Sequence, residues 1–451
     1  MVVDEAALRE ARRHPTLTGP PAEMPDPTSQ GWNAIDAVNI DDLVLNVMPQ
    51  IERVPVDFIQ AWGTAFQLVC ANLKSCIDQD GRDDVEVMRY LKWYLGIHQF
   101  LLSKRPRNRL KKRQKRSARR PEDSYLSERF LMFGERRYRD LIDAWRLDRA
   151  AHLRTRSHRA QIQRDFDPLD SNSDLGRRVT KCVRFIHEHH IGRGIRLLEG
   201  NGIVEATLVR DQMLAKHPAA KTEDRWEPNL PEEAESSSVD ITEWLGKLDP
   251  KSGSGTEGRR PHYLSCLADY RFEDADDNGG FSQAIPTLEG LWESFCEDKL
   301  TPLGYYYLTF GKLCTLVKSP ASMPGEIPDA RPVNAGFLDR RVVEKSLVKQ
   351  AGNQLRAHLE PQQLAIGTKF GCESLIWGMR VTLEQHPDWV CVSLDLKNAH
   401  NAFDRAKAME TLRKTVFEGR VGESDEEWVP AARTQKRHRE YVALLHCRMC
   451  E

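Results

Sequence analysis

The hydrophobic pattern near the C-terminal end of the sequence changes its period within a few residues. Residues 389–396, WVCVSLDL, alternate between apolar and less apolar positions, so Val390 and Val392 share one side of an extended chain and Asp395 lies on the other. Five apolar residues then recur at helical spacing: Ala402, Ala406, Met409, Leu412 and Val416. The sequence therefore predicts a buried strand that ends at a carboxylate and leads directly into a helix.

The carboxylate at this junction has two interpretations. Asp395 caps the helix that follows, a role for which Asn398 and Asn401 are also suited. Alternatively, it binds a metal ion beside amide N–H groups that hold phosphate. Spacing alone leaves both interpretations open.

The first half of the chain has helical periodicity. In residues 83–102 the apolar positions recur every three or four residues, at Val87, Tyr90, Leu91, Tyr94 and Leu95. Residues 137–153 and 177–200 repeat this spacing. A helical N-terminal region is expected over residues 31–218, after a lead-in of residues 1–30 that is rich in proline and polar groups.

Composition divides the rest of the chain. Residues 219–262 are rich in Pro, Ser, Gly and Glu, which predicts a linker with one short helix around residues 239–248. Residues 287–300 are again helical in pattern. Short apolar runs follow, YYYLTF at 305–310 and LCTLV at 313–317, and favour strands. The expected fold class is α+β.

Charge is strongly segregated, although the net charge is only -1. Residues 101–200 carry 27 basic and 13 acidic residues, whereas residues 221–300 carry 8 basic and 19 acidic ones. Eleven of the 17 residues in the basic run, residues 104–120, are Lys or Arg. Its candidate nucleic-acid contacts are Arg109, Lys111, Lys112, Arg113, Lys115 and Arg116. Phosphate binding, a nuclear-import signal and a solvated loop all fit such a run.

Other classes of protein are disfavoured. The sequence contains no run of about eighteen apolar residues, so it predicts no membrane span. The N-terminus has no apolar segment of the kind found in secretory signals. The ten cysteines are scattered and not densely spaced, which is typical of reduced thiols. An intracellular protein without a membrane partner is expected.

Residues 395–405, DLKNAHNAFDR, resemble the first palm motif of reverse transcriptases from non-LTR retrotransposons, Asp-Leu/Phe-Lys-Asn-Ala-Phe-Asn-x-x-x-Arg. Three upstream segments resemble the same family in the same order. Residues 313–320 (LCTLVKSP) are similar to a fingers strand ending in Lys-Pro, and residues 330–347 to an Arg-Pro-Ile segment followed by a basic helix. Residues 359–381 are similar to the Pro-x-Gln-x-Gly-x-x-x-Gly-x-Glu segment. The resemblance covers most of residues 31–416.

The resemblance implies a partial reverse transcriptase domain over residues 285–416, with fingers and the start of a palm. It makes Asp395 the catalytic residue and a ligand of Mg²⁺, which activates the attacking 3′-hydroxyl and neutralises pyrophosphate. It places six further residues near the incoming deoxynucleoside triphosphate: Lys318, Arg331, Leu396, Asn398, Ala399 and His400. RNA and DNA are the implied partners.

Two departures limit the expected activity. His400 stands where the family has an aromatic residue that discriminates between sugars. Residues 417–451 diverge from the family, and the chain contains no Tyr/Phe-x-Asp-Asp segment to supply the remaining metal carboxylates. An incomplete and inactive polymerase of retrotransposon origin is expected. A non-catalytic nucleic-acid-binding protein is the alternative, and an interaction module built on the helices is a third.

Overall fold

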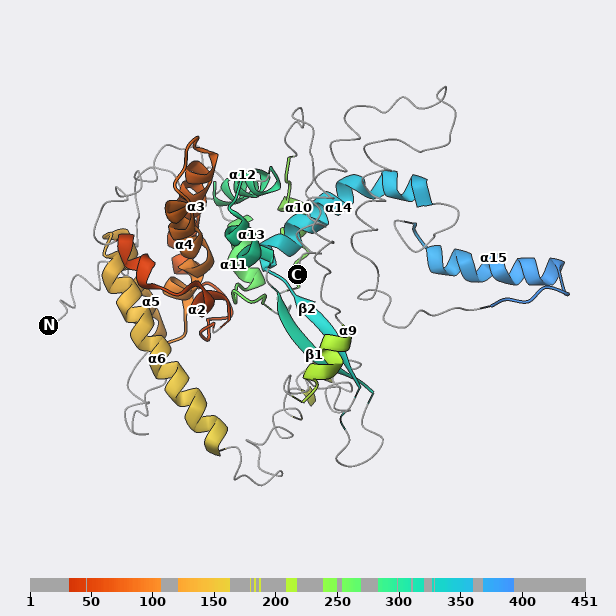
Figure 1. Cartoon of the computed structure of the whole chain (residues 1–451), viewed down its shortest axis with the longest axis horizontal. Helices are drawn as coiled ribbons and strands as arrows, with labels where there is room; N and C mark the ends of the chain where they lie inside the picture. The colour runs from red at the N-terminus through yellow and green to blue at the C-terminus, as the bar shows by residue number, and fades with distance from the viewer. Residues whose placement is uncertain are drawn as a thin grey trace.

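The computed structural model describes residues 32–45, 47–106, 121–162, 208–216, 238–249, 254–268, 283–297, 299–309, 311–319, 327, 329–359 and 368–392, together with five positions between 179 and 187. The first part consists of η1 (Trp32–Ala37), α2 (Ile40–Val44), η2 (Val56–Phe58), α3 (Ile59–Asp78), α4 (Asp84–Leu102), α5 (Pro121–Gly134) and α6 (Tyr138–Ile162). Then follow α9 (Arg210–Lys216), α10 (Thr242–Leu245), α11 (Pro261–Ala268), α12 (Ala284–Cys296) and α13 (Pro302–Thr309). The last elements are β1 (Lys312–Ser319), β2 (Asp329–Ala335), α14 (Leu338–Leu359) and α15 (Gly371–Gln385) (Figure 1).

Local sequence explains why the central helix α4 forms where it does. The side chain of Asp83 accepts a hydrogen bond from the Val85 N–H at 2.9 Å, which caps the first turn. The five residues predicted to share a face, from Val87 to Leu95, are all buried. The predicted helices at 137–153, 239–248 and 287–300 are confirmed as α6, α10 and α12. The predicted helix at 177–200 lies mainly outside the described residues.

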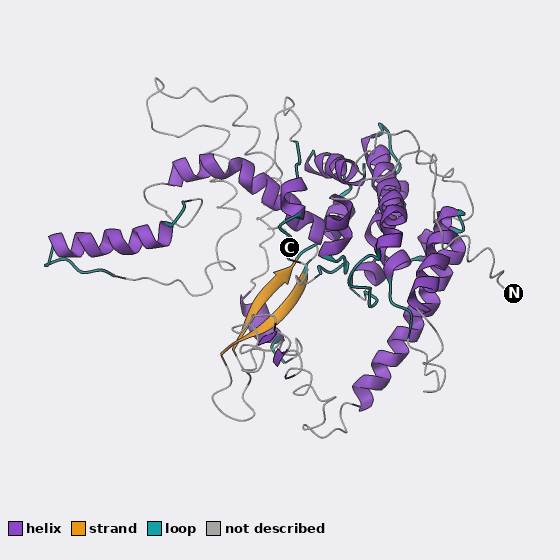
Figure 2. Cartoon of the chain, turned by 180° about the vertical axis from the view of Figure 1, so that it is seen from behind, coloured by secondary structure: helices purple, strands orange, loops and turns teal. Residues whose placement is uncertain are grey.

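One hydrophobic core joins the two parts of the chain. It runs from Ile35 to Leu347 and takes residues from α2 to α6 and from α10 to α14. The indole N–H of Trp62 in α3 donates to the carbonyl of Tyr263 in α11 at 2.7 Å. The later helices α11, α12 and α13 lie directly beside the N-terminal helices (Figure 2). The predicted N-terminal region and the segment after it therefore share a core across the expected boundary.

A buried ion pair holds this junction together. Arg259 is 1 % exposed and Asp339, in the first turn of α14, is 2 % exposed. The Arg259 guanidinium donates to Asp339 Oδ2 and, at 2.8 Å, to the carbonyl of Tyr94 in α4. The Tyr94 hydroxyl donates to the same Asp339 oxygen at 2.5 Å. The pair thus connects α4, the loop before α11 and α14.

The predicted linker is wrong for residues 254–262. Thr256, Glu257 and Arg259 are buried in the core, and α11 begins at Pro261. A composition rich in glycine and serine predicts a solvated linker. Two of the glycines here instead allow the backbone to pack closely against neighbouring parts of the core. A Cβ on Gly255 would come within 2.5 Å of the Gly336 carbonyl, and Gly258 has a φ of +86°. Residues 219–237 lie outside the described part of the chain.

The sheet is smaller than the sequence predicted. β1 and β2 form a two-stranded antiparallel sheet, which confirms a strand at 313–317. The run at 305–310 was expected to be a strand, but residues 305–309 lie in α13. The prediction is wrong because a short apolar run fits a buried helix as well as a strand. The predicted α+β class is confirmed only in general terms, as a mostly helical fold with one small sheet among the described residues. Within the described residues, no helix is long and apolar enough to cross a membrane.

The predicted strand at 389–396 is also wrong over the residues that are described. Residues 389–392 have no strand structure, and Val390 and Val392 are 84 % and 70 % exposed. A segment with alternating hydrophobicity forms a strand only when it can pair with a neighbouring strand and pack its apolar side against a core. Residues 389–392 have no such neighbour among the described residues. Residues 393–396 lie outside them.

The buried ion pair makes a testable contribution to stability. Asp339→Ala leaves the buried Arg259 guanidinium without its carboxylate, so we expect a loss of about 3–5 kcal/mol in the free energy of unfolding. Urea denaturation measures this loss. The control is Glu384→Ala, which breaks the exposed Arg380–Glu384 pair and should cost no more than about 1 kcal/mol. Equal losses in the two variants would contradict a structural role for the buried pair.

Candidate functional site

Most residues that the sequence assigned to a site lie outside the described part of the chain. These are Asp395, Leu396, Asn398, Ala399 and His400 of the palm-like motif, and Arg109, Lys111, Lys112, Arg113, Lys115 and Arg116 of the basic run. The two residues that the resemblance assigns to the fingers lie in strands, Lys318 in β1 and Arg331 in β2. The structure therefore brings the segments of Lys318 and Arg331 together and leaves their relation to Asp395 untested.

Both flanks of the basic run are attached to the core. On its N-terminal side, Ser103 forms a β-bridge with Gln50, and the Lys104 N–H donates to the Pro49 carbonyl at 2.7 Å. The ring of His152 in α6 lies 2.9 Å from the Lys104 carbonyl, measured from Nε2. On the C-terminal side, the run leads into α5 at Pro121. Residues 107–120 therefore connect two core helices and are not a chain terminus.

The β1–β2 hairpin presents Arg331 to solvent. Leu316 pairs with Arg331 and Val317 with Ala330, and an irregularity separates Val317 from Ser319. Ala330 is buried and Arg331 is exposed, because successive strand residues point to opposite faces. Lys318 belongs to the strand paired with that of Arg331, two residues beyond Leu316. The hairpin thus places the strand segment that contains Lys318 beside the Arg331–Pro332 segment.

Helix α9 covers the other face of the hairpin. Val209 and Met213 pack with Ala330 and the partly buried Val317. The Lys216 ammonium donates to Asp329 Oδ1 at 2.5 Å and to the Ala330 carbonyl at 2.6 Å. These contacts fix one end of β2 while the Arg331 side remains open to a ligand.

Basic side chains of α14 form hydrogen bonds and ion pairs with other parts of the fold. Arg340 is 4 % exposed, donates to the Thr309 carbonyl at 2.6 Å and pairs with Glu344 at 3.5 Å. Lys349 pairs with Glu243, near the start of α10. This part of the expected basic helix therefore stabilises the fold, and Arg340 is not available to phosphate.

Two titratable groups with shifted pKa values, Glu257 and His98, lie beside the buried ion pair. Burial raises the pKa of Glu257, and the positive charge of Arg259 only partly offsets this effect. Its Oε1 accepts a hydrogen bond from the Leu338 N–H at 2.9 Å. Burial, together with the Arg259 charge, lowers the pKa of His98 well below its ordinary value. Burial therefore disfavours the charged form of each side chain next to the ion pair.

His98 and Glu257 act as structural groups. His98 Nε2 lies 2.8 Å from the Glu257 carbonyl, so the neutral ring donates from Nε2. The Gln99 amide donates to the same carbonyl at 3.2 Å. Clustered pKa shifts often mark catalytic sites, but such sites also open to a ligand, and these groups are fully buried. Sequence reasoning missed Glu257 because it assigned residues 219–262 to a linker, although the paired glycines at 255 and 258 were an available signal. His98 lies in α4, in a segment predicted to be helical.

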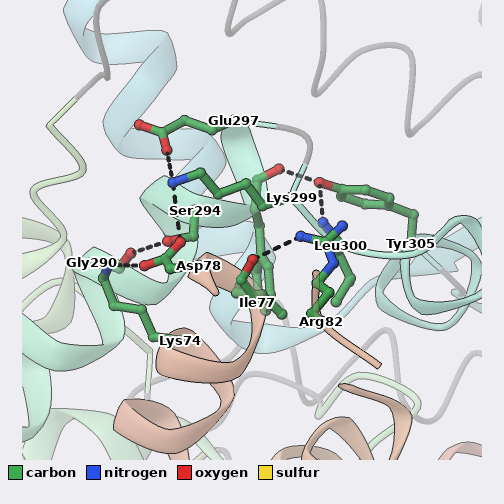
Figure 3. Close-up of polar contacts among 11 residues, drawn as sticks. Lys74, Ile77, Asp78, Arg82, Gly290, Ser294, Glu297, Lys299, Leu300 and Tyr305 are labelled. Atoms are coloured by element: carbon green, nitrogen blue, oxygen red, sulfur yellow. Dashed lines mark hydrogen bonds and ion pairs between the residues drawn. The ribbon is translucent and has the colours of Figure 1, made fainter. Parts of the chain in front are cut away.

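A shallow hollow lies elsewhere, between α3 and the first turns of α12, with a volume of about 410 Å³. At its edge, Lys74 and Lys299 both contact the carboxylate of Asp78, and Lys299 also pairs with Glu297 at 2.7 Å (Figure 3). Burial disfavours the charged form of Asp78, but hydrogen bonds from the two lysines outweigh it and lower its pKa. These charges neutralise one another and tie α12 to the end of α3.

No metal-binding cluster is found in the described part of the chain, where His, Cys, Asp and Glu side chains do not gather in groups of three or more. The implied Mg²⁺ ligand, Asp395, lies outside that part. The comparisons with protein families, with curated proteins and with solved structures give no match for this chain.

The raised pKa of Glu257 predicts a specific dependence on pH. A group whose pKa is higher in the folded state stabilises the fold below its ordinary value of 4.5, and this stabilisation is lost as the pH rises through the folded value. Glu257→Gln keeps the group neutral and removes the loss. Urea midpoints measured from pH 5 to 9 should therefore fall less steeply for the variant than for the wild type.

The control for this experiment is Glu384→Gln, an exposed position where we expect a profile parallel to the wild type. The lowered pKa of His98 acts in the opposite direction: its stabilisation is present above pH 6.5 and is lost at lower pH in both proteins. Parallel profiles for wild type and Glu257→Gln would contradict the neutral, buried state of Glu257.

Proposed function

We propose that this chain derives from a non-LTR retrotransposon reverse transcriptase, and that it binds RNA or DNA without polymerising nucleotides by itself. The observation that carries the proposal is the order of four family-like segments between residues 313 and 405, two of which pair as a hairpin. A strand ending in Lys-Ser, which resembles the family's strand ending in Lys-Pro, is followed by a strand containing Arg-Pro and a long helix, from Lys312 to Leu359.

Arg331 is the described residue best suited to a triphosphate. It is exposed on the hairpin face opposite α9, and a guanidinium binds phosphate oxygens through two parallel hydrogen bonds. Lys318 would add a second positive charge from the neighbouring strand. This arrangement supports nucleotide binding as the ancestral use of the hairpin.

Nucleic-acid binding would depend mainly on the basic run. Eleven positive charges within 17 residues attract a polyanion, because their binding to phosphates releases condensed counterions. The attachment of both flanks to the core would hold these charges close to the helical bundle. A non-catalytic nucleic-acid-binding protein is the second candidate function, and the same charge segregation favours it.

Catalysis by these 451 residues is not expected. Two-metal nucleotidyl transfer requires carboxylates on facing strands, and Mg²⁺ bound there would activate the 3′-hydroxyl and stabilise the leaving pyrophosphate. Asp395 supplies one such carboxylate in the resemblance, and the sequence contains no Tyr/Phe-x-Asp-Asp segment to supply the others. A lone carboxylate binds Mg²⁺ weakly, because the ion keeps most of its water.

Salt dependence tests the binding proposal. The logarithm of the affinity for duplex DNA should fall linearly with the logarithm of the salt concentration, with a slope of about -0.9 per neutralised phosphate. Replacing the six residues Arg109, Lys111, Lys112, Arg113, Lys115 and Arg116 with Gln should flatten the slope by up to about 5 units. Fluorescence anisotropy at several salt concentrations measures both slopes.

The control carries Gln at three basic positions elsewhere, Lys345, Arg356 and Arg380, all of them exposed. The change in slope relative to the wild type should be smaller for this control than for the six-residue variant. An unchanged slope in the six-residue variant would return the basic run to the solvated-loop interpretation.

Primer extension tests the absence of catalysis. The purified chain should not extend a primer on an RNA template with Mg²⁺ or Mn²⁺, and Asp395→Ala should behave in the same way. A reverse transcriptase of known activity under the same conditions is the positive control. Template-dependent extension that disappears in Asp395→Ala would show that other carboxylates of this chain complete the site.

A further inference from the structure

Five apolar side chains of α15 lie on one face of the helix and remain in contact with water, whereas Trp377 and Val381 are exposed outside this face. The five residues fall within about 100° around the helix axis, given 3.6 residues per turn: Cys372, Leu375, Ile376, Met379 and Leu383. Leu375 and Ile376 are 52 % and 60 % exposed, and Met379 is 37 % exposed. An ordered stripe of this kind on a helix is typical of a face that packs against another element.

The chain after α15 turns back along the helix. The Trp389 N–H donates to the His386 carbonyl at 3.0 Å, and the two rings stack at 4.3 Å between centroids. The Cys391 thiol lies 3.5 Å from the sulfur of Met379, in the middle of the apolar face. In both views α15 lies away from the helical bundle and the following residues run back beneath it (Figures 1 and 2). The residues after Val392 therefore start beside this face.

The sequence places a second amphipathic segment soon afterwards. Residues 402–416 lie outside the described residues, and their pattern predicts a helix with a stripe of similar width: Ala402, Ala406, Met409, Leu412 and Val416. At 1.5 Å per residue, 15 residues span about 22 Å, and α15 also has 15 residues. The two apolar stripes match in length and width.

We propose that the apolar face of α15 is the docking surface for residues 402–416 of the same chain, packed on it as a helix. The contacts of α15 and the hydrophobic pattern of residues 402–416 support this docking, whether or not the chain derives from a polymerase. It names a definite occupant for a surface that is open to water in the described structure.

The length of the connection favours this occupant over a second copy of the chain. Nine residues separate Val392 from Ala402, and the ten steps from one Cα to the next span at most about 36 Å when extended, which covers the whole of α15. A tether of this length gives an effective concentration in the millimolar range. A second copy at micromolar concentration would compete poorly for the same face.

Charge is complementary as well. Residues 371–392 carry three acidic residues and one basic residue, a net charge of -2 with His386 neutral. Residues 402–416 carry two acidic and four basic residues, a net charge of +2. Opposite net charges on the flanks of two apolar stripes favour their association.

Hydrogen–deuterium exchange of the full chain tests the proposal. Ile376→Asp places a charge in the docking face and should raise amide exchange in residues 402–416 by about tenfold or more, because an unpaired charge is disfavoured in a packed interface. Met409→Asp should raise exchange in residues 371–385 in the same way. Ser374→Asp, on the opposite side of α15, is the control and should leave exchange in residues 402–416 unchanged.

The core provides a check on folding, because no residue of α15 belongs to the hydrophobic core. The urea midpoint of the core should therefore stay the same in all three variants. Raised exchange confined to the substituted segment would overturn the proposal. Protection in the wild type that disappears on tenfold dilution would also overturn it, since it would identify a second copy as the occupant.

Discussion

The buried pair between Arg259 and Asp339 is the interaction on which the rest of the structure depends. Removing two charges from water is unfavourable, so the pair persists only because further groups complete its surroundings. The Tyr94 hydroxyl and carbonyl bond to it, and the rings of Phe66 and Tyr94 lie within 5.0 Å of the guanidinium. Burial raises the pKa of Glu257 and lowers that of His98, so both shifts disfavour a further charge beside the pair. Residues from α3, α4, the loop before α11 and α14 are thereby fixed in one arrangement.

The pair also determines where the candidate fingers hairpin lies. Asp339 stands in the first turn of α14, only four residues after the end of β2, so the hairpin leaves the bundle at a defined point. Helix α9 then holds β2 through Lys216, and Arg331 faces water on the other side. The exposed guanidinium is thus supported by rigid elements, which is the condition for a side chain to meet a ligand with little loss of entropy.

The described residues divide into two kinds of surface. The core from Ile35 to Leu347 buries its large aromatic side chains, whereas α15 and residues 389–392 keep theirs in water. An isolated helix of about 15 residues is only marginally stable in water, so α15 gains stability when another segment covers its apolar face. This contrast separates the described residues that pack into one core from those whose apolar side chains remain exposed.

The sequence by itself determined the helices, because the apolar positions of α4, α6 and α12 recur at the helical period and Asp83 caps α4. It also predicted the strand at 313–317 and, through the family resemblance, a basic helix after the Arg-Pro segment, but it did not predict the strand β2. Only the tertiary structure decided that residues 254–262 are core and not linker, that residues 305–309 are helical, and that Arg340 is buried. The reason is physical: local pattern records which face is apolar, but burial of Glu257, Arg259 and Asp339 depends on partners up to 245 residues away in the chain.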